Sequence, residues 1–377
     1  MTGGLSPTSA ATLAADVVVL STGDVRVPVY PDAAAAQPRA ADQPYPLPAG
    51  TDALRNAIAA RAGVPARDVL VAPGARLAIL SVLAAAVADR REVLLPTPYW
   101  SSYPTLIRAA GGVPVVVPDV GSFAGARTRD TGVVVVNSPR NPDGYVVPAK
   151  QLRALVEWAG AGGITVLFDQ VYRGVPGVGP VAPSVLDLGP GLPAHCAVVD
   201  GLSKSHALAG LRLGWALVSG ALREAAVVHA SHVVGGTGVP VQEAALAALA
   251  DRGVRSRLEP VLAANLEYAL GRLATVPGVA CRRPEGGIFL FPEVRFPEGR
   301  LPGGGPHAAD RVRWLREEHR LAVVDGAAFG APGHLRLSFA VPPDQLRTGI
   351  DRLCLALRGP AGTGPTLTGP ARTRGEA

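Results

Sequence analysis

Short apolar runs alternate with longer helical segments through most of this chain, and this alternation constrains the fold more than any other feature. Glycine, proline and polar residues separate the runs from segments with helical periodicity. Apolar strands that alternate with helices form a mostly parallel sheet covered on both faces. We therefore expect an α/β fold with a three-layer αβα architecture, with strands near residues 68–71, 93–95, 113–117, 133–136, 164–168 and 196–199, a further apolar run at 215–218, and helices at 77–88, 99–110 and 148–161.

Several polar residues and one glycine follow directly on the predicted strands. Ligands of such sheets bind at the carboxyl ends of the strands, so these residues are expected to meet at one site. The glycine also opens a predicted helix, where free backbone N–H groups and the helix dipole suit a phosphate. The residues concerned are Gly74, Asn137, Asn141, Asp169 and Lys204.

Lysine is almost absent from the sequence, and one of its two lysines follows directly on a predicted strand. The chain holds only Lys150 and Lys204, while its other basic residues are mostly arginines. Lys204 follows the apolar run 197–199, and we expect it in a loop with Arg212 close behind. An arginine could carry the same charge there, but only a desolvated lysine can lose its proton and attack a carbonyl carbon. The plain alternative is a solvated loop lysine.

The chain is long enough for two domains, and its texture changes after residue 265. Short strands near 288–291, 321–324 and 335–337, with helices near 308–320 and 343–357, predict a smaller α+β domain that an N-terminal strand joins. We expect a flexible N-terminal tail (1–14), an N-terminal segment joining the small domain (15–40), a large cofactor-binding domain (41–265), a small C-terminal domain (266–357) and a disordered tail (358–377).

Composition argues against several classes of protein. The net charge is +6, but the arginines are mixed with acidic residues and form no basic run with aromatics, so no nucleic-acid partner is expected. Three widely spaced cysteines fit a reducing cytoplasm. An uninterrupted apolar stretch of about 18 residues is missing, so no membrane partner is expected. His229 and His232 have helical spacing, but no third metal ligand suggests itself.

A lysine that attacks a carbonyl suggests an aldehyde cofactor with an electron-withdrawing ring, and the chain has residues for such a group. A carboxylate is needed to keep the ring nitrogen protonated, and Asp169 is placed for it. The turn at 74–76 and Arg212 could bind a phosphate. Residues 98–100 offer an aromatic ring for stacking. Asn141 and Tyr172 could donate to a phenolic oxygen.

With these motifs in place, the chain resembles the class I/II aminotransferases, fold type I enzymes that use pyridoxal 5′-phosphate (PLP). The resemblance covers roughly residues 17–357, and the motifs occur in the family's order. It is carried by the segments 20–24 (LSTGD), 73–76 (PGAR), 98–103 (PYWSSY), 137–144 (NSPRNPDG), 169–172 (DQVY), 203–204 (SK), 329–330 (FG) and 335–338 (LRLS). It implies a ping-pong transfer of an α-amino group to a 2-oxo acid, with the amino acid and the oxo acid as small-molecule partners.

The resemblance also implies roles for individual residues. Catalysis would fall to Lys204 as the cofactor-bearing base, with Asp169 and Tyr172 acting on the cofactor ring. The substrate would meet Gly23, Asn141 and Arg336, whose guanidinium suits an α-carboxylate. Tyr45 would reach the phosphate of a neighbouring subunit, which implies a homodimer. The cofactor-binding set would be Gly74, Ala75, Arg76, Trp100, Asn141, Asp169, Tyr172, Ser203, Lys204, Arg212 and Tyr45 from the partner subunit. No metal is expected.

Four departures from the family pattern stand in or beside these motifs. Asp143 replaces the usual threonine, and Gly201 stands where many relatives have a phosphate-binding serine, a loss that Ser203 could offset. His206 takes a position that is often aromatic. The N-terminal segment reads Gly-Asp-Val-Arg in place of Gly-Glu-Pro-Asp, and Arg26 there is expected on the surface.

Three other functions stay open at this point. Another PLP-dependent reaction on an amino acid, namely elimination, cyclisation or oxidation, would use the same cofactor residues. A regulatory PLP-binding domain would need an N-terminal DNA-binding extension, for which only about 15 residues precede the first strand. A non-catalytic PLP-binding protein is disfavoured by the presence of Lys204, Asp169 and Arg336.

Overall fold

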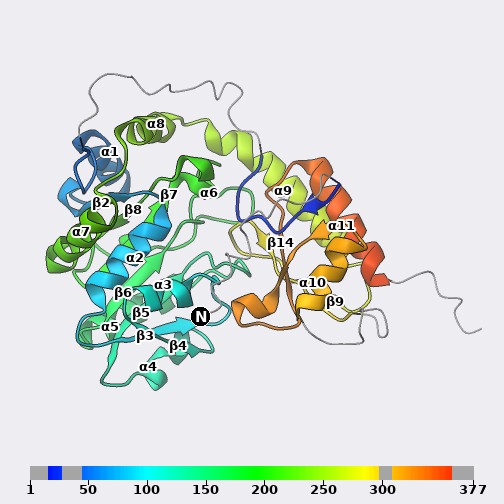
Figure 1. Cartoon of the computed structure of the whole chain (residues 1–377), viewed down its shortest axis with the longest axis horizontal. Coiled ribbons are helices and arrows are strands. Elements are labelled where there is room, and N and C mark those ends of the chain that lie inside the picture. The colour runs from blue at the N-terminus through cyan, green and yellow to red at the C-terminus, as the bar shows by residue number, and fades with distance from the viewer. Residues whose placement is uncertain (1–15, 28–44, 297–307, 359–377) are drawn as a thin grey trace, which may run out of the picture.

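The computed structural model describes residues 16–27, 45–296 and 308–358. Figure 1 shows two lobes side by side. The larger lobe contains a sheet and the helices that cover it, and the smaller lobe contains α9, α10 and α11. Our predictions for the tail 1–14, for residues 28–40 and for 359–377 lie outside the described residues. In the described ranges, no helix combines the length and apolarity needed to cross a membrane.

A seven-stranded sheet in the order β2-β8-β7-β6-β5-β3-β4 forms the centre of the larger lobe. Strand β8 runs antiparallel to both of its neighbours, and all other pairs are parallel. The predicted mostly parallel sheet is therefore confirmed. The strands are β2 (Val69–Ala72), β3 (Glu92–Pro96), β4 (Val113–Val117), β5 (Thr131–Asn137), β6 (Thr165–Asp169), β7 (Cys196–Gly201) and β8 (Gly214–Leu217).

Both faces of this sheet are buried, because successive side chains point to opposite sides. Val166 and Phe168 of β6 pack with helices α1 (Asp52–Ala62), α5 (Ala149–Ala161) and α8 (Val239–Ala250). Leu167 points to the other face. There the core includes α2 (Ala75–Ala86), α3 (Tyr103–Ala109) and α7 (Gly220–Val234). This is the expected three-layer arrangement, and it explains why the strands read as continuous apolar runs.

Strand register brings the predicted polar residues together. Asn137 at the end of β5 lies opposite Asp169 at the end of β6, and Asp169 lies opposite Val199 of β7. Strand β7 continues to Gly201 and leads directly into α6 (Leu202–Ser205). The carboxyl ends of three neighbouring strands therefore form one edge that carries Asn137, Asp169 and Lys204.

The smaller lobe has its own apolar core, built from α9 (Val254–Leu273), α11 (Pro343–Arg358) and short strands. Strand β14 (Leu335–Ser338) lies between β10 (Phe289–Leu290) and β13 (Val324–Asp325). The N-terminal β1 (Val18–Val19) pairs in parallel with β12 (Leu321–Ala322). The remaining α-helices and strands are α4 (Phe123–Ala126), β9 (Val279–Ala280), β11 (Glu293–Val294) and α10 (Ala308–Glu317).

The predicted domain boundary after residue 265 falls inside α9. The buried apolar residues from Val254 to Leu273 all belong to the core of the smaller lobe, so we propose that the large domain ends near residue 253. The pairing of β1 with β12 supports grouping the described residues 16–27 with the small domain.

Helix α3 begins later than the sequence predicts, at Tyr103 instead of residue 99. The amide N–H of Tyr99 donates to the carbonyl oxygen of Phe329 in the small lobe, at 3.1 Å. A proline occupies the first turn of α3, a position that proline favours. The residues before it therefore remain a loop that bridges the two lobes.

Candidate active site

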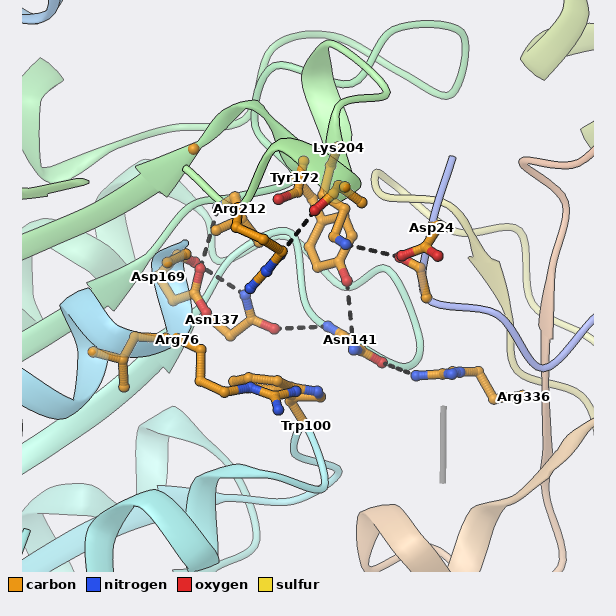
Figure 2. A pocket seen from close by; sticks show the side chains of 18 residues that line it. Asp24, Arg76, Trp100, Asn137, Asn141, Asp169, Tyr172, Lys204, Arg212 and Arg336 are labelled. Atoms are coloured by element: carbon orange, nitrogen blue, oxygen red, sulfur yellow. Dashed lines mark hydrogen bonds between the residues drawn. The ribbon is translucent and has the colours of Figure 1, made fainter. Parts of the chain in front are cut away.

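A cavity of about 440 Å³ opens at the carboxyl edge of the sheet, between the two lobes. Figure 2 shows the side chains that line it, which come from both lobes and from the N-terminal segment. The structure brings eleven of the thirteen predicted site residues to its walls: Gly23, Ala75, Arg76, Trp100, Asn141, Asp169, Tyr172, Ser203, Lys204, Arg212 and Arg336. Gly74 and Tyr45 are the two that do not line the cavity.

Lys204 lies on the one-turn helix α6 and not in the loop that the sequence suggested. The fully buried Leu202 anchors this turn, and its carbonyl oxygen accepts from the amide of His206. The Nζ amine donates to the carbonyl oxygen of Gly23 at 2.9 Å. Burial lowers the pKa of Lys204 to about 8, with Asp24 acting in the opposite direction. The amine is therefore partly neutral near physiological pH.

Asp169 ends β6 and is held from two sides. Its carboxylate accepts from the hydroxyl of Tyr103 at 2.6 Å and from the amide of Val171 at 3.2 Å. Burial raises the pKa of Asp169 to about 6, while these hydrogen bonds and Lys204 lower it. Sequence reasoning missed Tyr103. The sequence signal that could have identified Tyr103 is its position three residues after Trp100. The two rings pack edge to face, with their centroids 5.2 Å apart.

Two asparagine side chains connect the sheet edge with the small lobe (Figure 2). Asn137 donates to the carbonyl oxygen of Asp169 at 3.0 Å and accepts from the amide of Asn141 at 2.8 Å. The side-chain amide of Asn141 donates to the Tyr172 hydroxyl at 3.5 Å, and its oxygen accepts from Arg336 at 3.1 Å. Asn137 was noted at a strand end, but the sequence assigned it no role.

Arg76 and Arg212 approach one another near the start of α2. Burial lowers the pKa of Arg76, and the charge of Arg212 lowers it further. Gly74 lies just behind them, and a Cβ atom there would come within 2.5 Å of the Arg212 guanidinium. The Arg76 guanidinium lies over the ring of Trp100, 5.1 Å from its centroid. Two cations that disfavour one another at a helix N-terminus fit an anionic group such as a phosphate.

Arg336 is the largest fully buried side chain in the described residues. It lies between the rings of Phe289 and Phe329, 4.2 and 4.9 Å from their centroids. Its two terminal nitrogens donate to Asn141 and to the carbonyl oxygen of Ser21, and neither partner is charged. The Nε nitrogen has no hydrogen-bond partner in the described part of the chain. A buried guanidinium of this kind fits an incoming carboxylate.

Asp24 also lines the cavity, although the sequence singled out only its neighbour Gly23. Its amide is tied to the Thr22 hydroxyl at 3.1 Å, and its side chain is half-buried. The sequence signal that could have identified Asp24 was the departure from the family pattern in this segment.

Four cationic and two acidic side chains line the cavity in total, which favours ligands with a net negative charge.

Most of the other residues that the sequence marked lie outside the cavity wall. His206 is buried against Ser205, with Nδ1 and Oγ 2.8 Å apart, and burial lowers its pKa to about 4. Arg26 is exposed. His229 hydrogen bonds to Ser81 at 3.1 Å, and no metal-binding cluster occurs among residues that the structure describes. Gly201 does line the cavity.

Comparison with known proteins agrees with this architecture. The family model "Aminotransferase class I and II" matches residues 15–353. An aspartate aminotransferase of Geobacillus stearothermophilus is 34% identical over 76% of this chain and 75% of its own length. A probable aspartate/prephenate aminotransferase of Aquifex aeolicus is 30% identical over 83% of each chain.

Solved structures give the same result. The aspartate aminotransferase of Thermotoga maritima superposes with a TM-score of 0.81 at 29% identity, over 90% of this chain and 91% of its own. The enzyme of Rhizobium meliloti superposes with a TM-score of 0.80 at 27% identity, over the same shares. The sequence match covers nearly all of the described fold and the whole cavity. The chain therefore belongs to the class I and II aminotransferase family.

Proposed function

We propose that this aminotransferase binds PLP in the cavity and moves the α-amino group of an amino acid to a 2-oxo acid. The observation that carries the proposal is the buried Lys204 amine, which shares one cavity with two carboxylates and three arginines. When bound, PLP supplies an electrophilic aldehyde and a protonated ring that withdraws electrons from the substrate's α-carbon.

The residues of the cavity fit that cofactor, and we assign them as follows. Arg76, Arg212 and the backbone at Ala75 would bind the phosphate, with Gly74 allowing the close approach of Arg212. Ser203 would add a hydroxyl beside the lysine. Trp100 would stack on the ring, Asp169 would hold the proton on the ring nitrogen, and Tyr172 with Asn141 would donate to the phenolic oxygen.

Lys204 has the properties of a group that attaches the cofactor and then moves a proton. Its pKa of about 8 leaves part of the amine neutral at pH 7 to 8, as a nucleophile or base requires. Arg336 would hold the substrate carboxylate, and its flanking aromatic rings keep the guanidinium in one place. Asp169, ionised above pH 6, would keep its charge against the ring over the same range.

Removal of Lys204 tests the proposal. In Lys204→Ala, we expect loss of the visible cofactor absorbance band that depends on the lysine, together with loss of turnover by a factor on the order of 10⁴. The assay is a panel of amino acids, with L-aspartate first because several matched relatives are named for it. Each is scored for stoichiometric conversion of an oxo-acid acceptor. Retained amino transfer in the variant would refute the assignment.

The acceptor measurement also separates transfer from the other reactions of an amino acid. Elimination, cyclisation or oxidation would consume the amino acid without forming one equivalent of the acceptor's amino acid. Transfer must form it. A product analysis with and without the oxo acid therefore decides between them.

We also propose a cytoplasmic homodimer in which Tyr45 serves the neighbouring subunit. The Tyr45 side chain is 98% exposed and does not line the cavity of its own chain. Cys196, Cys281 and Cys354 are free thiols, which supports a reducing compartment. Light scattering tests the dimer, and Tyr45→Phe should weaken cofactor binding without changing the oligomeric state. Unchanged cofactor affinity would remove Tyr45 from the site.

A further inference from the structure

The N-terminal segment Ser21–Asp24 touches both cations that an amino-acid substrate would need to meet. The carbonyl oxygen of Ser21 accepts from Arg336 at 3.0 Å. Two residues later, the carbonyl oxygen of Gly23 accepts from Lys204 Nζ at 2.9 Å. Residues 21–24 therefore form hydrogen bonds both with the guanidinium proposed to bind the carboxylate and with the reactive amine.

The Asp24 carboxylate lies at the amine end of this segment. Figure 2 shows the Asp24 side chain nearer to Lys204 than to Arg336. Of the charged groups around Lys204, Asp24 acts most strongly on it and favours a protonated amine. Within residues 16–27, 45–296 and 308–358, no side chain or backbone group donates a hydrogen bond to this carboxylate.

The second carboxylate of the cavity, Asp169, already accepts hydrogen bonds from the protein. Asp169 accepts hydrogen bonds from Tyr103 and from the amide of Val171, and it sits at the sheet edge away from Arg336. Asp24 is therefore the acidic group of the described cavity wall that remains available to a ligand. Its half-buried position would strengthen a contact with a cation, because water screens such a contact only in part.

An amino acid enters as a zwitterion, with an ammonium and a carboxylate on one carbon. Arg336 matches the carboxylate. The amino group being transferred must come to the position of the lysine nitrogen. The ammonium would therefore lie where Lys204 Nζ now donates to the carbonyl oxygen of Gly23. We propose that Asp24, together with the carbonyl oxygen of Gly23, binds the α-ammonium group of the incoming amino acid, so that the site selects zwitterions over simple carboxylic acids.

This inference rests on the proposed function, but it predicts a different readout. Asp24→Asn should weaken binding of the amino acid and leave binding of the same molecule without its amino group unchanged. The probes are the amino acid that the wild type converts fastest in the panel and the carboxylic acid with hydrogen in place of that amino group. Rapid mixing with the cofactor-loaded enzyme gives the half-saturating concentration of the first and the inhibition constant of the second.

We expect Asp24→Asn to raise the half-saturating concentration of the amino acid about 10- to 100-fold, as for a lost charge-assisted hydrogen bond. The inhibition constant of the carboxylic acid should stay within about twofold, because that acid has no ammonium group. Asp24→Glu keeps the charge and should restore much of the affinity. Arg26→Gln, at an exposed position in the same segment, should change neither constant.

Equal changes in both constants would overturn the inference, since they would indicate general damage to the site. No change in either constant would also overturn it. Asp24→Ser serves as a second neutral variant if the asparagine variant is unstable. Failure of the proposed function is read separately, from retained amino transfer in Lys204→Ala.

Discussion

Two groups of residues meet in the cavity, and they are built in opposite ways. The sheet-edge group (Arg76, Trp100, Asp169, Lys204 and Arg212) comes from the large domain, from the end of β6, from α2 and α6, and from the loops that hold residues 100 and 212. The cross-domain group (Gly23, Asp24, Asn141 and Arg336) comes from three distant segments. Its hydrogen bonds span up to 315 residues of sequence, from Ser21 to Arg336.

The difference separates two tasks. One continuous sheet holds the sheet-edge group, so its geometry is set by strand register and resists small movements of the lobes. The cross-domain group depends on how the small lobe and the N-terminal segment pack against the large domain. We expect changes in the first group to abolish the chemistry and changes in the second to weaken substrate binding first.

Lys204→Arg should have the largest effect, because it preserves the charge of the sheet-edge group and removes only the ability to lose a proton. We expect turnover to fall by about 10⁴-fold or more, with the protein still folded by circular dichroism. Lys150→Arg is the matched control and should behave as wild type. Substantial turnover in Lys204→Arg would show that charge alone is what the site needs.

Arg336→Lys should come next, and it should act on binding. The lysine cannot form the planar two-point contact with a carboxylate, so we expect KM for the amino acid to rise about 10- to 100-fold with a smaller change in kcat. Arg313→Lys, on an exposed face of the small lobe, should change neither. If kcat falls and KM stays constant, the proposed division of tasks between the two groups is wrong.

Tyr103→Phe should have a moderate effect that depends on pH. The hydroxyl lowers the pKa of Asp169, so its removal should raise that pKa further above 6. Because we propose the ionised carboxylate as the active form, the acidic limb of the pH–rate profile should move to higher pH, with turnover at pH 7 about tenfold lower. Tyr268→Phe removes a hydroxyl bonded to Asp351 and should leave the profile in place. A limb that stays fixed would exclude Asp169 as its source.

Asp200→Asn should have the smallest effect, on stability and not on turnover. Burial raises the pKa of Asp200 from 3.8 to about 7, so between those values the folded state keeps a proton that the unfolded state has lost. The free energy of unfolding should therefore fall as pH rises through this range, and the asparagine variant should show less of that decline.

Urea denaturation of the cofactor-free protein at pH 4, 5.5 and 8 measures this contribution. Asp130→Asn, at an exposed position, should follow the wild-type curve. Parallel curves for Asp200→Asn and the wild type would show that ionisation of Asp200 does not oppose folding.

Much of the sheet-edge group was predictable from the sequence. Apolar alternation predicted the parallel sheet, and parallel strands place their carboxyl ends at one edge, so Asp169 and Lys204 were expected to meet. The start of α3 and the one-turn helix that carries Lys204 were not predictable in this way. Both depend on contacts with other segments, including the hydrogen bond from Tyr99 to Phe329 of the other lobe.

The sequence by itself determined the fold class, the family and the chemical identity of the residues at the strand ends, because strand periodicity and the spacing of motifs are local properties. Only the tertiary structure decided that Tyr103 supports Asp169, that Arg336 is buried between two aromatic rings, and that Asp24 faces the cavity. These arrangements come from packing between segments far apart in the chain. The direction of a side chain in such a contact follows from the burial of its neighbours, which no local pattern of residues records.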